Sequence, residues 1–314
     1  MKATQEVSKL FSMLQKALLI GAVTFSGQVM AEEVKVQHAK GETSVQVPPA
    51  KTAVFDLASL DTMQALGVKA AGVPKAKFPD QFSDYRDESI ARVGSLFEPD
   101  HDALKQLAPD LVIIGGRSSA KYDDVSKLAP TIDMTVDTSK GLSSIEANVR
   151  TLAKIYKKEA EAEAALKKLS ESVDALKAKS ANAGSAMVVL AIDDKTSTFG
   201  PGSRFGQAYD IFGFTPVAAV KDLSAKDRHP VKLEDIVKAD PDWIFVIDRH
   251  AATGTEGKKP VKETLDNSIL KDTRAAKSQQ IVYLDPYNWY ILGSAGLNSL
   301  QQSVEQVSAA LDKK

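Results

Sequence analysis

The sequence predicts an α/β fold of two lobes, whose mainly parallel sheets are joined by one long bridging helix. Short apolar runs alternate with single helix-like segments in residues 32–143 and again in residues 180–314, which is typical of parallel strands linked by helices. Between these regions, residues 144–179 contain no Gly or Pro and are rich in Ala, Glu, Lys and Leu. The two regions also share a short repeated sequence, called here the echo: APDLVIIGGR at 108–117 is similar to DPDWIFVIDR at 240–249.

The first 31 residues have the pattern of a secretory signal peptide. Three lysines precede the apolar run ALLIGAVTF, and Val29 and Ala31 stand at the small-residue positions before a cleavage site, so we expect cleavage after about Ala31. The run is too short for a mature membrane span, which needs about 20 apolar residues. The chain has no cysteine, so neither a lipidated N-terminal cysteine nor a disulfide is expected. These features predict an exported, periplasmic protein without a lipid anchor.

The charge balance argues against nucleic acid as a partner. The whole chain carries 40 Lys and Arg against 41 Asp and Glu. Without Lys2, Lys9, Lys16 and Glu6 of the predicted signal, the balance is 37 against 40. No general basic field is therefore available to gather nucleic acid or anionic lipid. An anionic ligand would need cations placed locally.

Each lobe has its own succession of elements. In residues 32–143 the strand-like runs KTAVFDL, VKAAGVP, ARVGSL and DLVIIGG alternate with the helix-like runs LDTMQALG and DHDALKQLA. In residues 180–314 the strand-like runs SAMVVLAID, DWIFVID and QIVYLD surround the helix-like run KLEDIVKA, and an amphipathic helix follows from about Gly296. The segment 144–179 starts at the capping residues Ser143 and Ser144, and its apolar spacing is too irregular for a coiled coil.

The echo places one arginine at the end of a strand in each lobe. Aligning Pro109 with Pro241 also aligns Arg117 with Arg249. Ligands of open α/β sheets bind outside the carboxyl ends of the strands, which is where both arginines are expected. The alternative for each is a strand-end cap or an ion pair with a surface carboxylate such as Asp248.

A third arginine favours an anion-binding site. Arg204 lies in FGPGSRFG, where glycines and a proline form a turn directly after a strand, so the backbone there can approach a ligand closely. Three guanidinium groups at the mouth between two lobes would suit an anion, because guanidinium bonds pairs of oxygens in a planar, bidentate geometry.

The chain resembles a known family over essentially its whole predicted mature length: the periplasmic binding proteins of ATP-driven importers for ferric siderophores, cobalamin and haem. The resemblance is carried by DALKQLAPDLVIIGG, the long helical segment, LEDIVKADPDWIFVID and VYLDPYNWYILG. Within that family the chain is most similar to the binders of ferric catecholate siderophores. The resemblance implies capture of an anionic ferric catecholate siderophore in the interlobe cleft, and delivery to an inner-membrane ABC permease with its ATPase.

The resemblance also implies roles for five residues. Arg117, Arg204 and Arg249 would line the cleft, while His229 in KDRHP and Tyr290 in NWYILG would ligate the iron. Fe(III) favours oxygen donors such as phenolate, and imidazole is also a common iron ligand. Two catecholates would leave two octahedral positions for these side chains. The iron would arrive within the siderophore complex, so no intrinsic cofactor is expected.

Alternatives exist for both iron ligands. His250, beside Arg249, is a second candidate histidine, and a lone histidine in a polar loop such as that of His229 is usually only solvated. Tyr290 belongs to a run of aromatic residues whose other members are equally suited to a core: Tyr283, Tyr287 and Trp289.

Asp102 and Glu234 form a second pair of equivalent positions. Each is expected on the helix that precedes the Pro-Asp strand of its lobe. A carboxylate on a helix surface is usually only solvated, whereas the resemblance implies that both dock on arginines of the permease. The protein is expected to work as a monomer and to close only modestly around its ligand, because bending a continuous helix breaks backbone hydrogen bonds.

Several other functions are disfavoured. The chain has no GxSxG, HExxH or Walker motif, so we predict no enzyme, and a secreted α/β hydrolase is a remote alternative. A haem or cobalamin carrier of the same transport class is the closest alternative, since haem also uses His or Tyr ligands. A hydroxamate siderophore would leave three arginines under-used, and no cluster of histidines and carboxylates suggests a zinc or manganese carrier.

Overall fold

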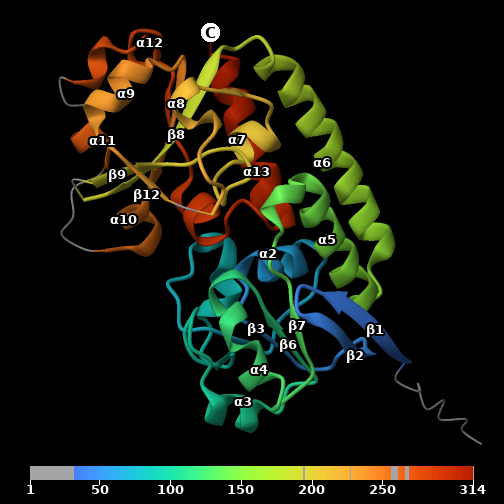
Figure 1. Ribbon diagram of the computed structural model, residues 1–314. Helices are drawn as coiled ribbons and strands as arrows, with labels where there is room; N and C mark the ends of the chain where they lie inside the picture. The colour runs from blue at the N-terminus through green and yellow to red at the C-terminus, as the bar shows by residue number, and fades with distance from the viewer. Residues whose placement is uncertain (1–31, 194, 227, 256–260, 266–268, 314) are drawn as a thin grey trace, which may run out of the picture. The chain divides into compact units, whose positions relative to one another are not determined.

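The computed structural model describes residues 32–193, 195–226, 228–255, 261–265 and 269–313 (Figure 1). The signal peptide expected in residues 1–31 lies outside this part of the chain. No helix within the described residues is long and apolar enough to cross a membrane.

The N-terminal lobe is built on a five-stranded parallel sheet with the order β5-β4-β3-β6-β7. An antiparallel hairpin of β1 (Glu32–His38) and β2 (Gly41–Val47) precedes it. The strands of the sheet are β3 (Thr52–Val54), β4 (Gly72–Val73), β5 (Ala91–Arg92), β6 (Leu111–Ile114) and β7 (Thr131–Asp133). Its helices are α2 (Leu57–Ala65), η1 (Asp80–Arg86), α3 (His101–Leu107), η2 (Gly116–Lys121), α4 (Tyr122–Val125) and η3 (Thr138–Lys140).

The C-terminal lobe holds a six-stranded mixed sheet with the order β11-β9-β8-β12-β13, to which β10 adds by pairing with β8. Its strands are β8 (Ser185–Ile192), β9 (Lys195–Thr198), β10 (Thr215–Pro216), β11 (His229–Val231), β12 (Trp243–Asp248) and β13 (Ile281–Tyr283). The antiparallel pairs are those of β9, with β8 on one side and β11 on the other. The other strands of this sheet pair in parallel, so mainly parallel sheets are confirmed in both lobes.

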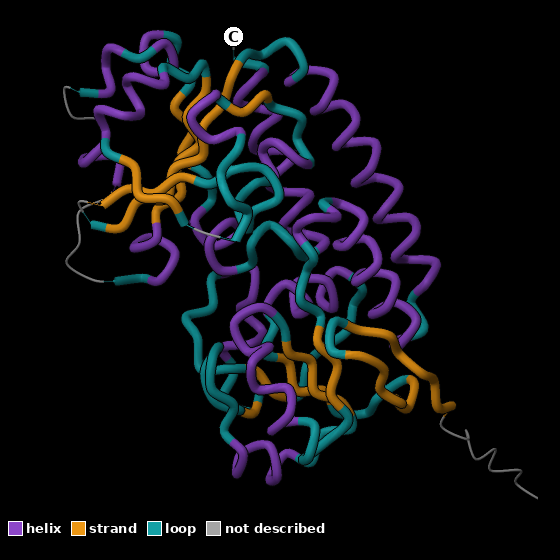
Figure 2. Tube along the Cα trace, in the orientation of Figure 1, coloured by secondary structure: helices purple, strands orange, loops and turns teal. Residues whose placement is uncertain are grey.

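The helices of the C-terminal lobe lie on both faces of this sheet (Figure 2). They are α7 (Gln207–Asp210), α8 (Ala218–Lys221), α9 (Leu233–Ala239), α10 (Arg249–Thr253), α11 (Val261–Leu265), η4 (Leu270–Asp272), α12 (Arg274–Lys277), the π-helical η5 (Tyr287–Ile291) and α13 (Leu297–Leu311). The central strands β8 and β12 are almost fully buried, as expected for strands covered on both faces.

The prediction of one continuous helix over residues 144–179 is wrong. The segment forms two helices, α5 (Leu142–Tyr156) and α6 (Glu159–Ser180). They pack as an antiparallel pair. Arg150 of α5 bonds Glu163 of α6 at 2.8 Å across the turn, which is consistent with this arrangement. Only α6 extends along both lobes (Figure 1). The helix ends without Gly or Pro because Lys157 adopts the left-handed conformation, with φ 56° and ψ 48°.

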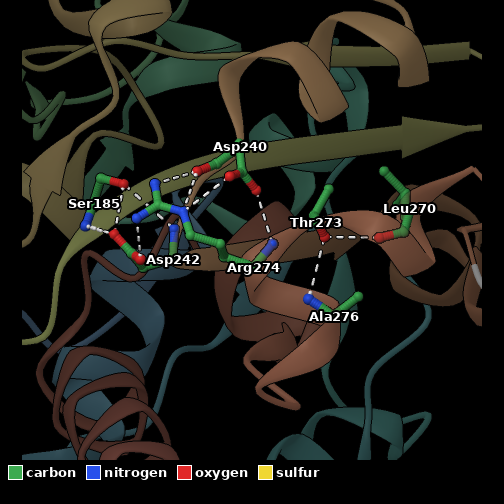
Figure 3. Close-up of polar contacts among 7 residues, drawn as sticks. All are labelled: Ser185, Asp240, Asp242, Leu270, Thr273, Arg274 and Ala276. Atoms are coloured by element: carbon green, nitrogen blue, oxygen red, sulfur yellow. Dashed lines mark hydrogen bonds and ion pairs between the residues drawn. The ribbon is translucent and has the colours of Figure 1, made fainter.

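The two echoing Pro-Asp sequences anchor strands. Asp110 accepts a hydrogen bond at 2.8 Å from the amide of Lys51, which precedes the neighbouring strand β3. Asp242 accepts one at 2.7 Å from the amide of Ser185, the first residue of the neighbouring strand β8. Arg274 adds an ion pair to Asp242 at 2.7 Å (Figure 3). Each aspartate thus fixes the start of its own strand to the start of the next.

A buried polar contact joins α2 of the N-terminal lobe to α13 of the C-terminal lobe. Asp61 accepts a hydrogen bond from the amide of Ser299 at 2.9 Å, and the hydroxyl of Thr62 accepts one from the amide of Leu297 at 3.1 Å. These amides belong to the first turn of α13, where no helical carbonyl is available to them. A Cβ on Gly296 would lie 2.3 Å from the Asp61 carboxylate, so the close approach requires glycine.

Candidate ligand site between the lobes

Arg117 is presented at the carboxyl edge of the N-terminal sheet. It follows β6 in η2, after Gly116, whose φ is 48°. Its Nη2 donates to the carbonyl of Tyr290 at 2.7 Å, and its Nη1 donates to the carbonyl of Ile291 at 2.9 Å. An arginine of one lobe therefore reaches the backbone of the other.

Arg204 comes from the glycine-rich turn after β9. A Cβ on Gly200 would lie 2.7 Å from the carbonyl of Val220, so this turn packs too closely for a larger residue at that position. The Nη2 of Arg204 donates to the carbonyl of Tyr290 at 2.6 Å. Arg117 and Arg204 thus share one acceptor.

Arg249 is the first residue of α10 and follows directly after β12. Its Nε donates to the hydroxyl of Tyr290 at 3.1 Å. The alternative partner Asp248 instead caps α10 by accepting from the amide of Ala251 at 3.0 Å, and also accepts from the amide of Val261 at 3.1 Å.

Tyr290 is the centre of the cluster. The guanidinium carbons of Arg117, Arg204 and Arg249 lie 5.8, 5.4 and 6.0 Å from the centroid of its ring, within the range of cation–π attraction. The ring also stacks on Phe205 at 6.3 Å. Its neighbour Trp289 is fully buried and packs against Phe212, so the two aromatic residues separate into a site residue and a core residue.

The cluster is electrostatically prepared for an anion. In the described part of the chain none of the three arginines forms an ion pair with a carboxylate. The pKa of Arg204 is lowered to about 10 because surrounding protein atoms desolvate its partly exposed guanidinium and Arg117 lies nearby. Desolvation also lowers the pKa of Arg117, partly offset by Tyr290 and Asp56. Arg117 and Arg204 repel each other because both are positive, and a negative ligand would offset this repulsion.

Two hollows adjoin the arginines. A cavity of about 400 Å³, called here the rear cavity, is lined by Arg117 and Arg204 together with residues of both lobes: Asp56, Ala58, Gly116, Met134, Thr135, Val136, Thr138, Gln207, Ile291, Leu292, Gly293 and Ala295. A hollow of about 240 Å³ is lined by Arg204, Tyr290 and their neighbours: Leu190, Phe199, Phe205, Ala225, Lys226 and Arg228. Arg204 and the Tyr290 segment lie between the two.

The structure does not bring His229 into the cluster. His229 is on the edge strand β11, opposite Thr198, and its Nε2 donates to the carbonyl of Ser224 at 3.1 Å. No hydrogen bond or ring contact of the described residues links it to Tyr290. The preceding residues Lys226 and Arg228 do line the same hollow as Tyr290.

The second histidine candidate, His250, is buried. His250 is 7% exposed, and its Nε2 accepts a hydrogen bond from the amide of Asp193 at 3.2 Å. This contact gives His250 a structural role between α10 and the end of β8.

Asp102 and Glu234 occupy the expected equivalent positions. Asp102 lies in the first turn of α3 with its side chain 95% exposed, and its contact with Lys105 is long, at 3.4 Å. Glu234 lies exposed in the first turn of α9. Both carboxylates are available at the surface.

Some residues near the site were missed from the sequence. Asp56 follows β3 at the same sheet edge as Arg117, and Gln207 opens α7 three residues after Arg204. Their positions close to a strand end and to Arg204 could have indicated them. They were missed because the site was predicted from apolar runs that end in a cation, and neither residue belongs to such a run.

Comparison with known proteins identifies the family. The chain matches the periplasmic binding protein family over residues 53–288. It belongs to that family. It is 38% identical over 288 residues to the petrobactin-binding protein YclQ of Bacillus subtilis (strain 168), with 90% of this chain and 89% of YclQ covered. The crystal structure of YclQ aligns with a TM-score of 0.85 and 37% identity, covering 90% of this chain and 100% of that one.

Two further family members agree. The ferric-anguibactin-binding protein FatB of Vibrio anguillarum (strain ATCC 68554 / 775) is 29% identical over 287 residues, with 89% of this chain and 88% of FatB covered. The periplasmic catecholate-siderophore binding protein VctP from Vibrio cholerae aligns with a TM-score of 0.82 and 30% identity, covering 90% of this chain and 100% of that one. The predicted family and fold class are therefore confirmed, as is a binding protein rather than an enzyme.

Proposed function

We propose that this protein captures an anionic ferric catecholate siderophore between its lobes and delivers it to an ABC permease for iron uptake. The observation that carries the proposal is the convergence of Arg117, Arg204 and Arg249, from both lobes, on the single side chain of Tyr290. Cations that lack carboxylate partners in the described part of the chain favour an anion with several oxygens. Relatives named for petrobactin, ferric anguibactin and a catecholate siderophore support this ligand class.

In this proposal the phenolate of Tyr290 ligates the iron directly. Its hydroxyl already accepts a hydrogen bond from Arg249 at 3.1 Å, which stabilises a negative oxygen at that place. Fe(III) is a hard cation that favours such donors. His229 supplies the second protein ligand by exchanging its bond to the Ser224 carbonyl for the metal.

Delivery requires a docking surface in each lobe. Asp102 and Glu234 lie in equivalent helices, one in each lobe, and both are exposed. We propose that each carboxylate forms ion pairs with arginines of the permease. An ATPase on the cytoplasmic side drives that permease. We further propose that the protein acts in the periplasm as a monomer.

The ligand class is tested by titrating purified protein with ferric bis-catecholate, a ferric trihydroxamate, haem and cobalamin in parallel. Binding is followed by quenching of Trp243 and Trp289 and by the visible charge-transfer band of the iron. The proposal expects tight binding of the bis-catecholate alone. Tight binding of haem or cobalamin with no response to the catecholate would reassign the carrier within its family.

Direct ligation is tested with Tyr290→Phe and His229→Ala. Tyr290→Phe keeps the ring beneath the three arginines but removes the phenolate, so the charge-transfer band of the bound complex should shift to that of the free bis-catecholate. His250→Ala is the matched histidine control, because His250 is held by Asp193 and should leave the band unchanged. Identical bands for the wild type and both site variants would show that the arginines alone hold the complex.

A further inference from the structure

Tyr290 belongs to a turn of unusual backbone geometry. The segment Tyr287–Ile291 (η5) is π-helical, because the amide of Leu292 donates to the carbonyl of Tyr287, five residues earlier, at 3.0 Å. Such turns are rare and are frequently found at functional sites. The last carbonyls of a helix have no partner within it, and in η5 those of Tyr290 and Ile291 accept from arginines of the cluster. The geometry of this turn therefore decides where the carbonyl and the ring of Tyr290 lie.

Asn288 holds the turn through hydrogen bonds of its backbone and of its side chain. Its backbone amide donates to Oδ1 of Asp285 at 2.7 Å, and its backbone carbonyl accepts from the amide of Ser294 at 2.7 Å. Its side chain accepts from Nε2 of Gln81 at 3.1 Å and donates to Oε1 of Gln302 in α13 at 2.8 Å. Asn288 is 3% exposed, so the loss of a side-chain partner would leave a buried polar group without a hydrogen bond, which is costly.

One side-chain bond of Asn288 crosses to the N-terminal lobe. Its partner Gln81 lies in η1. The carbonyl of Gln81 also accepts from Nε2 of Gln64, in α2, at 2.6 Å, so this partner is itself held in place. The next residue, Phe82, packs against Tyr287 with 6.0 Å between the ring centroids. The N-terminal lobe therefore contacts the π-helical turn at one polar and one aromatic position.

We infer that Asn288 is a positioning residue, which keeps η5 in the π-helical form so that the hydroxyl of Tyr290 meets the iron. This inference rests on the proposed function, in which Tyr290 ligates the metal. A π-helical turn spans one residue more than an α-helical turn, so relaxation to the α-helical form would rotate the Tyr290 ring relative to Arg249, to which its hydroxyl is bonded. Through Gln81 the N-terminal lobe thus contributes to the geometry of an iron ligand that the C-terminal lobe supplies.

The test compares the charge-transfer band and the affinity of bound ferric bis-catecholate in the wild type, Tyr290→Phe and Asn288→Leu. Leucine has nearly the shape of asparagine but makes neither side-chain bond. The band of Asn288→Leu should shift toward that of Tyr290→Phe, and the affinity should fall about ten-fold or more, as is typical when a group that orients a metal ligand is removed. The salt dependence of binding should remain that of the wild type, because the three arginines are unchanged.

Gln81 provides a milder test, because its side chain is only partly buried. Gln81→Leu removes the interlobe bond alone and should shift the band in the same direction by a smaller amount. Gln81→Glu should restore the wild-type band. The amides of Asn288 and Gln302 can both turn over, so that each bond re-forms with donor and acceptor exchanged.

Tyr156→Phe is the matched control for lost stability. It removes a buried hydrogen bond of 2.7 Å between the hydroxyls of Tyr156 and Thr52, which joins α5 to β3. It should lower the unfolding temperature without any change in the band. A thermal unfolding curve of each variant therefore separates a loss of stability from a loss of positioning.

The outcomes separate the inference from the proposed function. A wild-type band in Asn288→Leu, with the band of Tyr290→Phe shifted, overturns the positioning role and leaves ligation by Tyr290 standing. If Asn288→Leu does not fold, a wild-type band in Gln81→Leu overturns the inference in the same way. Identical bands for the wild type and Tyr290→Phe overturn direct ligation and the inference together. Failure of the wild type to bind the bis-catecholate overturns the proposed function itself.

Discussion

Arg117 of the N-terminal lobe donates a hydrogen bond of 2.7 Å to the carbonyl of Tyr290 in the C-terminal lobe. The two residues are far apart in the sequence, since Arg117 follows β6 of the N-terminal sheet and Tyr290 lies in η5 of the C-terminal lobe. Their contact defines the cleft, because the same tyrosine also receives Arg204 and Arg249. One residue thus gathers cations from η2, from α10 and from the turn after β9.

The interlobe contact at Asp61 predicts a pH dependence of stability. Burial raises the pKa of Asp61 from 3.8 to about 6, partly offset by hydrogen bonds from Ser299 and Asn298. A raised pKa means that the folded state favours the protonated form. The contribution is fully present below about pH 4 and is lost as the pH rises through about 6, amounting to about 3 kcal/mol. Asp61→Asn should remove this dependence.

The measurement is chemical unfolding of the wild type and of Asp61→Asn at pH 5 and pH 8. The variant should gain stability relative to the wild type at the higher pH, whatever constant offset the amide introduces. Asp102→Asn serves as the exposed control. A wild-type-to-variant difference that is the same at both pH values would contradict the assigned cause.

The break between α5 and α6 predicts a stabilising substitution. Lys157 has a φ of 56°, a conformation that costs an ordinary residue about 1 kcal/mol and that glycine adopts freely. Lys157→Gly should therefore raise the free energy of unfolding by about 0.5 kcal/mol or more. Lys154→Gly, in the last turn of the same helix, should lower it by about 1 kcal/mol. Urea unfolding of both variants checks the sign, and a loss of stability in both would argue for a continuous helix.

The paired strand anchors predict unequal losses. Asp242 accepts from the amide and hydroxyl of Ser185 and also pairs with Arg274, whereas Asp110 bonds the amide of Lys51. Asp242→Ala should lower the free energy of unfolding by about 2–4 kcal/mol, and Asp110→Ala by about 1 kcal/mol. Thermal and denaturant unfolding give both values. Equal losses would show that neither the Ser185 hydroxyl nor Arg274 adds to the anchor.

Much of the fold followed from local patterns in the sequence. The apolar runs of β6 and β12 fixed two central strands, and the alternation of short runs with single helices fixed their parallel pairing. The echo was also structurally meaningful, since Ala108 and Asp240 both end their helices in the left-handed conformation. The break at Lys157 was not predictable from breaker residues, because a lysine occupies the position where glycine is usual. The only sign of this break in the sequence was the irregular apolar spacing of residues 144–179.

The site was predictable to a different degree for each residue. The three arginines could be placed because each follows a strand, and Tyr290 was named through a family resemblance. Their mutual contacts depend on how two lobes meet, which no local pattern encodes. His229 shows the same limit, since its sequence position beside Arg228 did not reveal that its ring is bonded to the Ser224 carbonyl.

The central claim is that a cation from each lobe serves one anionic ferric ligand, and its most direct test is the affinity of ferric bis-catecholate for wild type and Arg117→Met over a range of ionic strength. The account predicts at least a ten-fold loss of affinity in the variant at low salt, and a shallower dependence on salt because one ionic contact is missing. An unchanged affinity with an unchanged salt dependence would contradict it.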